Sequence, residues 1–184
     1  MSARAGLHYR EGVTIAVSPG SYDPITLGHL DIIRRASALF DEVVVGVARN
    51  SAKSTLLDAD QRLALAEAAC ADLPGVRVAL VPGLLVDFCR DVGATVIVKG
   101  LRGGADFDSE LPMALMNRHL VGVETVFVPG DPALAHIASS LVKDVARFGG
   151  TIDDCVPDGV SSVLRAALDG TVDGSRNPPK QGVS

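Results

Sequence analysis

The sequence predicts an α/β fold, a five-stranded, doubly wound parallel sheet in a single domain. Five short apolar runs rich in β-branched residues are typical of strands buried on both faces. A segment with helical spacing separates each run from the next, as the βαβ units of a parallel sheet require. The chain has 184 residues, 47% of them apolar and 21% charged, which is enough for one sizeable core. The predicted strands are Val13–Val17, Glu42–Ala48, Val76–Val81, Thr95–Val98 and Glu124–Val128.

The helices follow from capping residues and apolar spacing. Thr26 is placed to cap a first helix over Leu27–Phe40, whose apolar residues recur every third or fourth position. Asp58, with Gln61 three residues later, has the capping-box pattern and precedes an Ala/Leu-rich helix that runs to Leu73. The other predicted helices are Leu84–Val92, about Ser109–Leu120, Ser140–Phe148 and Asp158–Leu168.

The two ends of the chain differ from its centre in composition. Residues 1–12 precede the first strand and form an N-terminal extension without the apolar core of a secretory signal. The folded domain is expected over 13–170. The last segment, 171–184, is rich in Gly, Pro, Ser and charge, and we expect it to be disordered.

Charge, hydropathy and cysteine content exclude several classes of protein. The net charge of −5 argues against a nucleic-acid or membrane surface as partner. No apolar run approaches the length of a membrane span. Cys70, Cys89 and Cys155 are odd in number and far apart, which fits reduced thiols in a cytoplasmic protein.

Basic residues gather in the loops that follow the predicted strands. Arg49, Lys53, Lys99 and Arg102 all lie there. These loops emerge at the carboxyl edge of the sheet, where open α/β proteins bind their ligands. An acidic chain with a basic ligand edge is predicted to bind phosphate groups.

The loop after the first strand, Ser18–His29, gives the most specific signal. Thr26 as the cap makes Gly28 and His29 the second and third helical residues, so unpaired N–H groups lie beside a residue without Cβ. A lone histidine here is more often a buried core residue or a plain cap. Thr-x-Gly-His directly after the first strand favours a phosphate site instead. Neither a GxxxxGK[ST] nor a GxGxxG motif occurs.

Several separated segments together resemble one family. SPGSYDPITLGH, KGLRGGADFDSE, MNRHL and IASSLVKDVARFGG are similar to motifs of the phosphopantetheine adenylyltransferase family, within the nucleotidyltransferases marked by (H/T)xGH. The resemblance covers roughly residues 13–168 and implies a Rossmann-like fold. It implies that ATP and 4′-phosphopantetheine, with Mg²⁺, give dephospho-coenzyme A and pyrophosphate. It also implies a homohexamer.

The resemblance assigns roles to individual residues. His29 matches the residue that stabilises the transition state at the α-phosphate. The implied contacts to 4′-phosphopantetheine are Ser21, Lys53, Leu85 and Lys99, where Lys53 binds the attacking phosphate and Lys99 replaces an Arg of many relatives. The implied contacts to ATP are Ser21, Tyr22, His29, Gly100, Leu101, Arg102, Glu110, Leu134, Ala135, His136, Ile137, Ala138, Ser139 and Ser140. No residue is assigned to a metal, because Mg²⁺ would be carried by the triphosphate.

The chain departs from the family pattern at three places. Ala138 replaces a third Ser, and Ala135 and His136 replace a Ser/aromatic pair near the adenine. Pro112 stands where relatives commonly carry Gln, and proline is tolerated without cost only in the first turn of a helix. We therefore expect the fourth helix to begin near Ser109 or to bend there.

Other interpretations stay open at this point. Arg49 and Lys53 alone would be solvated surface charges, and Asp106 and Glu110 would favour a helix start. A nucleotidyltransferase of the same fold that acts on nicotinate mononucleotide or a polyol phosphate is the nearest alternative. A non-catalytic nucleotide-binding regulator would bind ATP and release no pyrophosphate.

Overall fold

The strands pair in parallel around a central β1. We analysed a computed structural model, which describes residues 12–49 and 54–173. Within these ranges one sheet of five strands has the order β3-β2-β1-β4-β5, which confirms the predicted doubly wound fold. The strands are β1 (Ile15–Gly20), β2 (Glu42–Ala48), β3 (Val76–Val81), β4 (Val96–Leu101) and β5 (Glu124–Pro129).

Helices alternate with the strands along the chain. They are α1 (Leu27–Ser37), α2 (Ala59–Cys70), α3 (Leu85–Asp91), α4 (Gly104–Val121), the 3₁₀ turn η1 (Pro132–Leu134), α5 (Ser139–Arg147) and α6 (Val160–Asp173). Asp58 and Gln61 form the predicted capping box at the start of α2.

Side chains of β2 show how the two faces of the sheet are covered. Val45 and Val47 are buried in a cluster with residues of α1 and α2. Val44, which points to the opposite face, is buried with Phe88 and other residues of α3. This alternation is the two-sided burial expected for a parallel strand.

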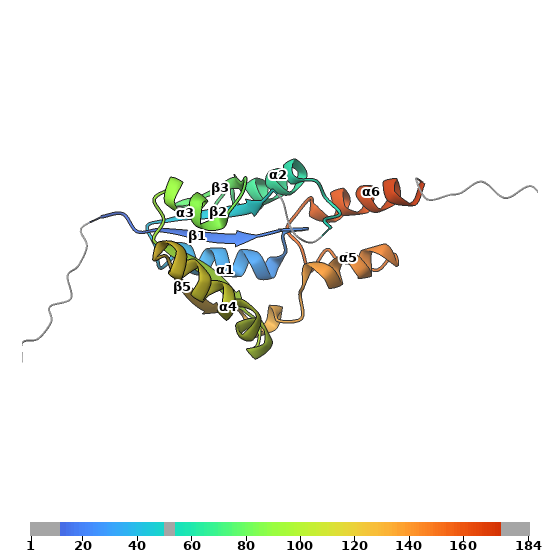
Figure 1. Cartoon of the computed structure of the whole chain (residues 1–184). Coiled ribbons are helices and arrows are strands. Elements are labelled where there is room, and N and C mark those ends of the chain that lie inside the picture. Colours follow the sequence, from blue (N-terminus) through green and yellow to red (C-terminus); the bar gives the residue numbers. More distant parts are fainter. Residues whose placement is uncertain (1–11, 50–53, 174–184) are drawn as a thin grey trace, which may run out of the picture.

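The last two helices lie beyond the carboxyl ends of the strands (Figure 1). Val142 of α5 and Leu164 of α6 belong to the same buried cluster as Ile33 of α1. The chain after β5 therefore closes one end of the sheet, at the edge where the strand-to-helix loops emerge.

Helix α4 starts five residues before the expected Ser109, and Pro112 lies inside it. Two α4 residues that precede Pro112, Asp106 and Phe107, make the contacts that fix the first turn of the helix. The Phe107 ring packs edge-on against Phe127 of β5, with centroids 5.1 Å apart. The Asp106 carboxylate accepts from the backbone N–H of Arg102 at 2.9 Å. The expected helix start near Ser109 is therefore wrong, and the alternative, a bend there, stays a prediction.

The ends of β1 and α6 also differ from expectation. β1 continues through Gly20, since its register with β2 is kept up to the pair Gly20 and Val47. α6 extends through Asp173, past the expected domain end at 170. Residues 1–11 and 174–184 lie outside the described ranges. No helix within those ranges is both long and apolar enough to cross a bilayer.

One glycine of β4 allows close packing of α1. A Cβ atom added to Gly100 would lie 2.5 Å from Cγ1 of Ile32. Real Cβ atoms do not approach other carbons so closely, so α1 lies against β4 only because this position has no side chain.

Candidate active site

A cavity of about 830 Å³ lies at the carboxyl edge of the sheet. The β1–α1 loop, the β4–α4 loop and the segment from Leu134 to the first turn of α5 contribute to its wall. Gly46 of β2 and Val81 of β3 also line it. A concave site at the switch point of a doubly wound sheet is the expected ligand site of this fold.

Thr26 and His29 form a capping box at the start of α1. The Thr26 hydroxyl oxygen accepts from the backbone N–H of His29 at 3.4 Å. The backbone N–H of Thr26 donates to Nδ1 of His29 at 3.1 Å. Because Nδ1 accepts this bond, the proton of a neutral ring is on Nε2. The cap therefore fixes the tautomer of the ring.

The surroundings of His29 keep its ring neutral. Burial lowers the pKa of His29 to about 4, and the nearby charge of Arg102 adds to the effect. The ring of Tyr22 packs edge-on against it, with centroids 5.0 Å apart. At neutral pH, His29 is thus an uncharged N–H donor beside the N-terminus of a helix, where an anion is stabilised.

Tyr22 itself adopts an unusual backbone conformation. Its φ is 47°, in the left-handed region that residues other than glycine rarely occupy. The hydroxyl donates to the backbone oxygen of Ser18 at 2.9 Å, and burial raises the pKa of Tyr22. These contacts hold the β1–α1 loop in a strained form, a feature that occurs preferentially at functional sites.

Two basic side chains in the cavity wall are paired with carboxylates of α4. Nζ of Lys99 lies 3.1 Å from Glu110. The Arg102 guanidinium bonds both carboxylate oxygens of Asp106, at 3.1 and 3.2 Å, and this hydrogen bonding lowers the pKa of Asp106. A phosphate group that enters the cavity would compete with these carboxylates for the two cations.

The first turn of α5 lines the same cavity. Ala138 is its N-cap and provides no side-chain hydrogen bond. Ser139 donates to the backbone oxygen of Pro24 at 2.9 Å, while Ser140 is exposed. The N–H groups of this turn are available to phosphate oxygens.

The structure brings most of the predicted site residues together, as the lining of the cavity shows. It is lined by Ser21, Tyr22, His29, Leu85, Lys99, Gly100, Leu101, Arg102, Glu110, Leu134, Ile137, Ala138, Ser139 and Ser140. Ala135 and His136 are exposed and are not among the lining residues. Lys53 lies outside the described residues.

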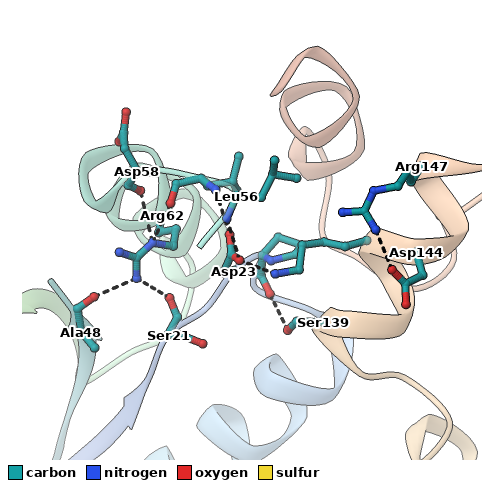
Figure 2. Close-up of polar contacts among 12 residues, drawn as sticks. Ser21, Asp23, Ala48, Leu56, Asp58, Arg62, Ser139, Asp144 and Arg147 are labelled. Carbon is teal, nitrogen blue, oxygen red and sulfur yellow. Dashed lines mark hydrogen bonds and ion pairs between the residues drawn. The ribbon is translucent and has the colours of Figure 1, made fainter. Parts of the chain in front are cut away.

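Sequence reasoning missed three charged residues around the β1–α1 loop (Figure 2). Asp23 is 3% exposed and accepts from the backbone N–H groups of Leu56 and Leu57 at 3.1 and 2.9 Å. It also pairs with Lys143 of α5. Arg62 of α2 is 1% exposed. Its position in register with the buried Ala66 and Cys70 was the available signal, since an arginine on a buried stripe needs polar partners.

The described residues offer no cage for Mg²⁺. Nowhere among them do three Asp, Glu, His or Cys side chains gather where they could hold an ion. The carboxylates that line the cavity include Asp106 and Glu110, which are engaged by Arg102 and Lys99. The donor set therefore does not fit a metal held by the protein alone.

A Rossmann-like sheet with a Thr-x-Gly-His helix start in its cleft defines a nucleotidyltransferase-type site, and comparisons with known proteins agree. The cytidylyltransferase-like family matches residues 17–145. A phosphopantetheine adenylyltransferase of a Nocardioides species is 54% identical over 156 residues, 85% of this chain and 98% of the relative. One from Bifidobacterium longum is 52% identical, over 85% of this chain and 95% of the relative.

A solved structure shares the fold at much lower identity. It comes from Vibrio parahaemolyticus and is described as a proposed nicotinate-nucleotide adenylyltransferase. It is 18% identical, has a TM-score of 0.63, and is matched over 85% of this chain and 95% of its own. The chain belongs to the cytidylyltransferase-like family and, within it, to the phosphopantetheine adenylyltransferases.

Proposed function

We propose that this chain transfers the adenylyl group of ATP to 4′-phosphopantetheine, which gives dephospho-coenzyme A and pyrophosphate. The relatives at 52–54% identity carry the name of that activity. The structural observation that carries the proposal is the neutral His29 ring, with Nδ1 bound to the α1 cap. With Nδ1 engaged in this way, the Nε2–H can donate to an α-phosphate oxygen.

The reaction needs placement and charge stabilisation more than a nucleophile from the protein. A phosphate oxygen of 4′-phosphopantetheine forms a bond to the α-phosphorus, and the bond from that phosphorus to the β-phosphate oxygen breaks, so pyrophosphate leaves. A phosphate monoester is already anionic at neutral pH, so no strong general base is required. His29 and the N-terminus of α1 stabilise the negative charge on the α-phosphate oxygens as it develops.

Lys99 and Arg102 complete the proposed site. They are expected to exchange their present partners, Glu110 and Asp106, for phosphate groups. In this proposal Lys99 and Lys53 both bind the phosphate of 4′-phosphopantetheine, which is the attacking group, and Arg102 binds ATP. In the proposal no residue of the chain holds Mg²⁺: the ion would be carried by the triphosphate and would supply charge neutralisation for the pyrophosphate.

The proposal extends to assembly and location. The family resemblance is the basis for proposing a homohexamer. Exposed apolar side chains on α4, namely Met113, Leu115, Met116 and Leu120, each at least 50% exposed, support a contact surface between copies of the chain. A cytoplasmic location is supported by three free cysteines, Cys70, Cys89 and Cys155. The net charge of −5 supports a protein without nucleic-acid or membrane partners.

Pyrophosphate release tests the function directly. The purified chain is incubated with ATP and Mg²⁺, and with either 4′-phosphopantetheine or nicotinate mononucleotide. We expect pyrophosphate release in the mixture that contains 4′-phosphopantetheine and none in the mixture that contains nicotinate mononucleotide. Release only with nicotinate mononucleotide would refute the proposal, and ATP binding without release with either compound would favour a regulator.

A further inference from the structure

The guanidinium of Arg62 is buried and bonds only to the main chain within the described residues. Nη1 donates to the backbone oxygen of Ser21 at 2.7 Å and to that of Ala48 at 2.8 Å. Nε donates to the backbone oxygens of Leu57 and Asp58 at 3.1 and 3.2 Å. One side chain therefore joins the β1–α1 loop, the end of β2 and the start of α2 (Figure 2).

Two of these segments line one half of the cavity. We call the lining residues Ser21, Ala48, Ser54 and Thr55 the acceptor half. The nucleotide half consists of the lining residues within 100–110 and 134–140. Lys99, which the proposed function assigns to the phosphate of 4′-phosphopantetheine, is counted with neither half. The bonds of Arg62 go to Ser21 and Ala48 themselves and to residues that follow Thr55. None of the bonds found among the described residues goes to the nucleotide half.

The backbone next to the Arg62 guanidinium has an unfavourable conformation that needs support from outside the loop. Ser21 immediately precedes Tyr22, whose φ of 47° requires outside support. Arg62 bonds the peptide oxygen of Ser21 and is not among the residues that line the cavity. It can affect a bound ligand only through the groups that it orients.

We propose that Arg62 is a positioning residue that sets the acceptor half of the cavity against the nucleotide half. This inference rests on the proposed function, since it takes the ligand of the acceptor half to be the phosphate end of 4′-phosphopantetheine. A lysine at this position keeps the charge but cannot reproduce four bonds from two nitrogens of a planar fork. Arg62→Lys should therefore disturb the acceptor half while the nucleotide half stays as it is.

The test measures folding, binding and turnover on the same proteins. Wild type, Arg62→Lys and Arg62→Met are compared by Tm, by calorimetric Kd for ATP and for 4′-phosphopantetheine, and by kcat and KM. The matched control is Val123→Ala. Val123 is 4% exposed and precedes β5 at the amino end of the sheet, so its truncation loosens the core away from the cavity.

We expect Arg62→Lys to lose kcat/KM for 4′-phosphopantetheine on the order of 10²-fold, because small misplacements of reacting groups have effects of this size. Its Kd for 4′-phosphopantetheine should rise more than its Kd for ATP, because most of the proposed ATP contacts lie in the nucleotide half. Arg62→Met should show a larger difference between its effects on the two Kd values. If it does not fold, Arg62→Lys decides alone. Val123→Ala should lower Tm and leave both Kd values unchanged.

Two results would overturn the inference. The first is an Arg62→Lys protein that loses Tm but keeps both Kd values and KM, as the control does, because Arg62 would then only stabilise the fold. The second is an equal rise of both Kd values. A wild type that binds 4′-phosphopantetheine but releases no pyrophosphate would refute the proposed function instead, and the binding comparison would still test the role of Arg62.

Discussion

The two halves of the cavity hold their charged groups in opposite ways. Next to the acceptor half, Arg62 and Asp23 are 1% and 3% exposed and bond to main-chain groups. The side chains of Lys99, which belongs to neither half, and of Arg102 in the nucleotide half are 24% and 47% exposed and pair with carboxylates of α4. Buried charges bonded to the backbone are fixed in place, because breaking their bonds leaves polar groups unpaired. Exposed ion pairs contribute little and can exchange partners. One half is therefore a rigid template, and the other can rearrange around phosphates.

His29 lies where the two halves meet, and its removal should have the largest effect. We expect His29→Ala to lower kcat by ~10²–10³, about 3–4 kcal/mol of barrier, as for other preorganised donors. Affinity for ATP should change little, because the contact strengthens in the transition state. Steady-state kinetics and ATP calorimetry on one preparation measure both. The control is His119→Ala, an exposed histidine of α4. A variant with reduced Tm and near-normal kcat would contradict the catalytic role.

Asp23→Asn should weaken the buried hydrogen bonds next to the acceptor half without removing a group that the proposal assigns to a ligand. The amide cannot accept every bond that the carboxylate accepts from Leu56, Leu57 and Lys143. We expect a loss of about 2–4 kcal/mol in the free energy of unfolding, measured by urea denaturation. Asp144→Asn removes an exposed pair with Arg147 and serves as the control, with an expected loss of under about 0.5 kcal/mol. Equal losses in the two variants would mean that burial of Asp23 adds nothing.

Burial of neutral His29 should make stability depend on pH. Its pKa is about 4 in the folded chain against 6.5 ordinarily, so between these values the unfolded chain binds a proton that the folded chain does not. Stability should therefore fall as pH drops from 6.5 to 4, by up to about 3 kcal/mol. Urea denaturation of wild type and His29→Gln at pH 7 and pH 4.5 measures the difference. A pH dependence that is the same in both proteins would show that His29 titrates normally when folded.

Lys99→Ala tests whether an exposed ion pair of the cavity exchanges its carboxylate partner for a phosphate. We expect the Kd for 4′-phosphopantetheine to rise by about 10-fold or more, the loss of one hydrogen bond to a charged group, and the Kd for ATP to rise less. Tm should stay close to that of wild type, because the Lys99–Glu110 pair is partly exposed. Calorimetry with each ligand decides. A larger effect on ATP would mean that the two phosphate positions are reversed.

Asp106→Asn should have the smallest effect and the opposite sign. It removes the carboxylate that holds Arg102 in the absence of ligand, so the Kd for ATP should fall by a few-fold at most, roughly the free energy of one exposed ion pair. The same variant should be less sensitive to salt in its ATP affinity. Weaker ATP binding would show instead that Asp106 orients Arg102 for the nucleotide.

Local signals predicted the fold and the start of α1, and distant contacts limited the rest. β2 and β3 have the predicted bounds because their apolar runs end at a charged residue and a proline. The Thr26 cap was predictable because its partner, His29, is three residues away. The start of α4 was missed because Phe107 packs against Phe127, twenty positions later in the chain. Asp23 and Arg62 were missed because their partners lie up to 120 and 41 positions away.

Gly100 shows how a position in a nucleotide loop can be determined by something other than the nucleotide. A methyl group there would collide with Ile32 of α1 at 2.5 Å, so glycine is required even when the cavity is empty. The identity of this residue therefore records how α1 and β4 fit together, whatever ligand the loop binds. Because α1 also carries His29, a redesign that seeks a new substrate should leave Gly100 and Ile32 unchanged and vary the side chains that face the cavity.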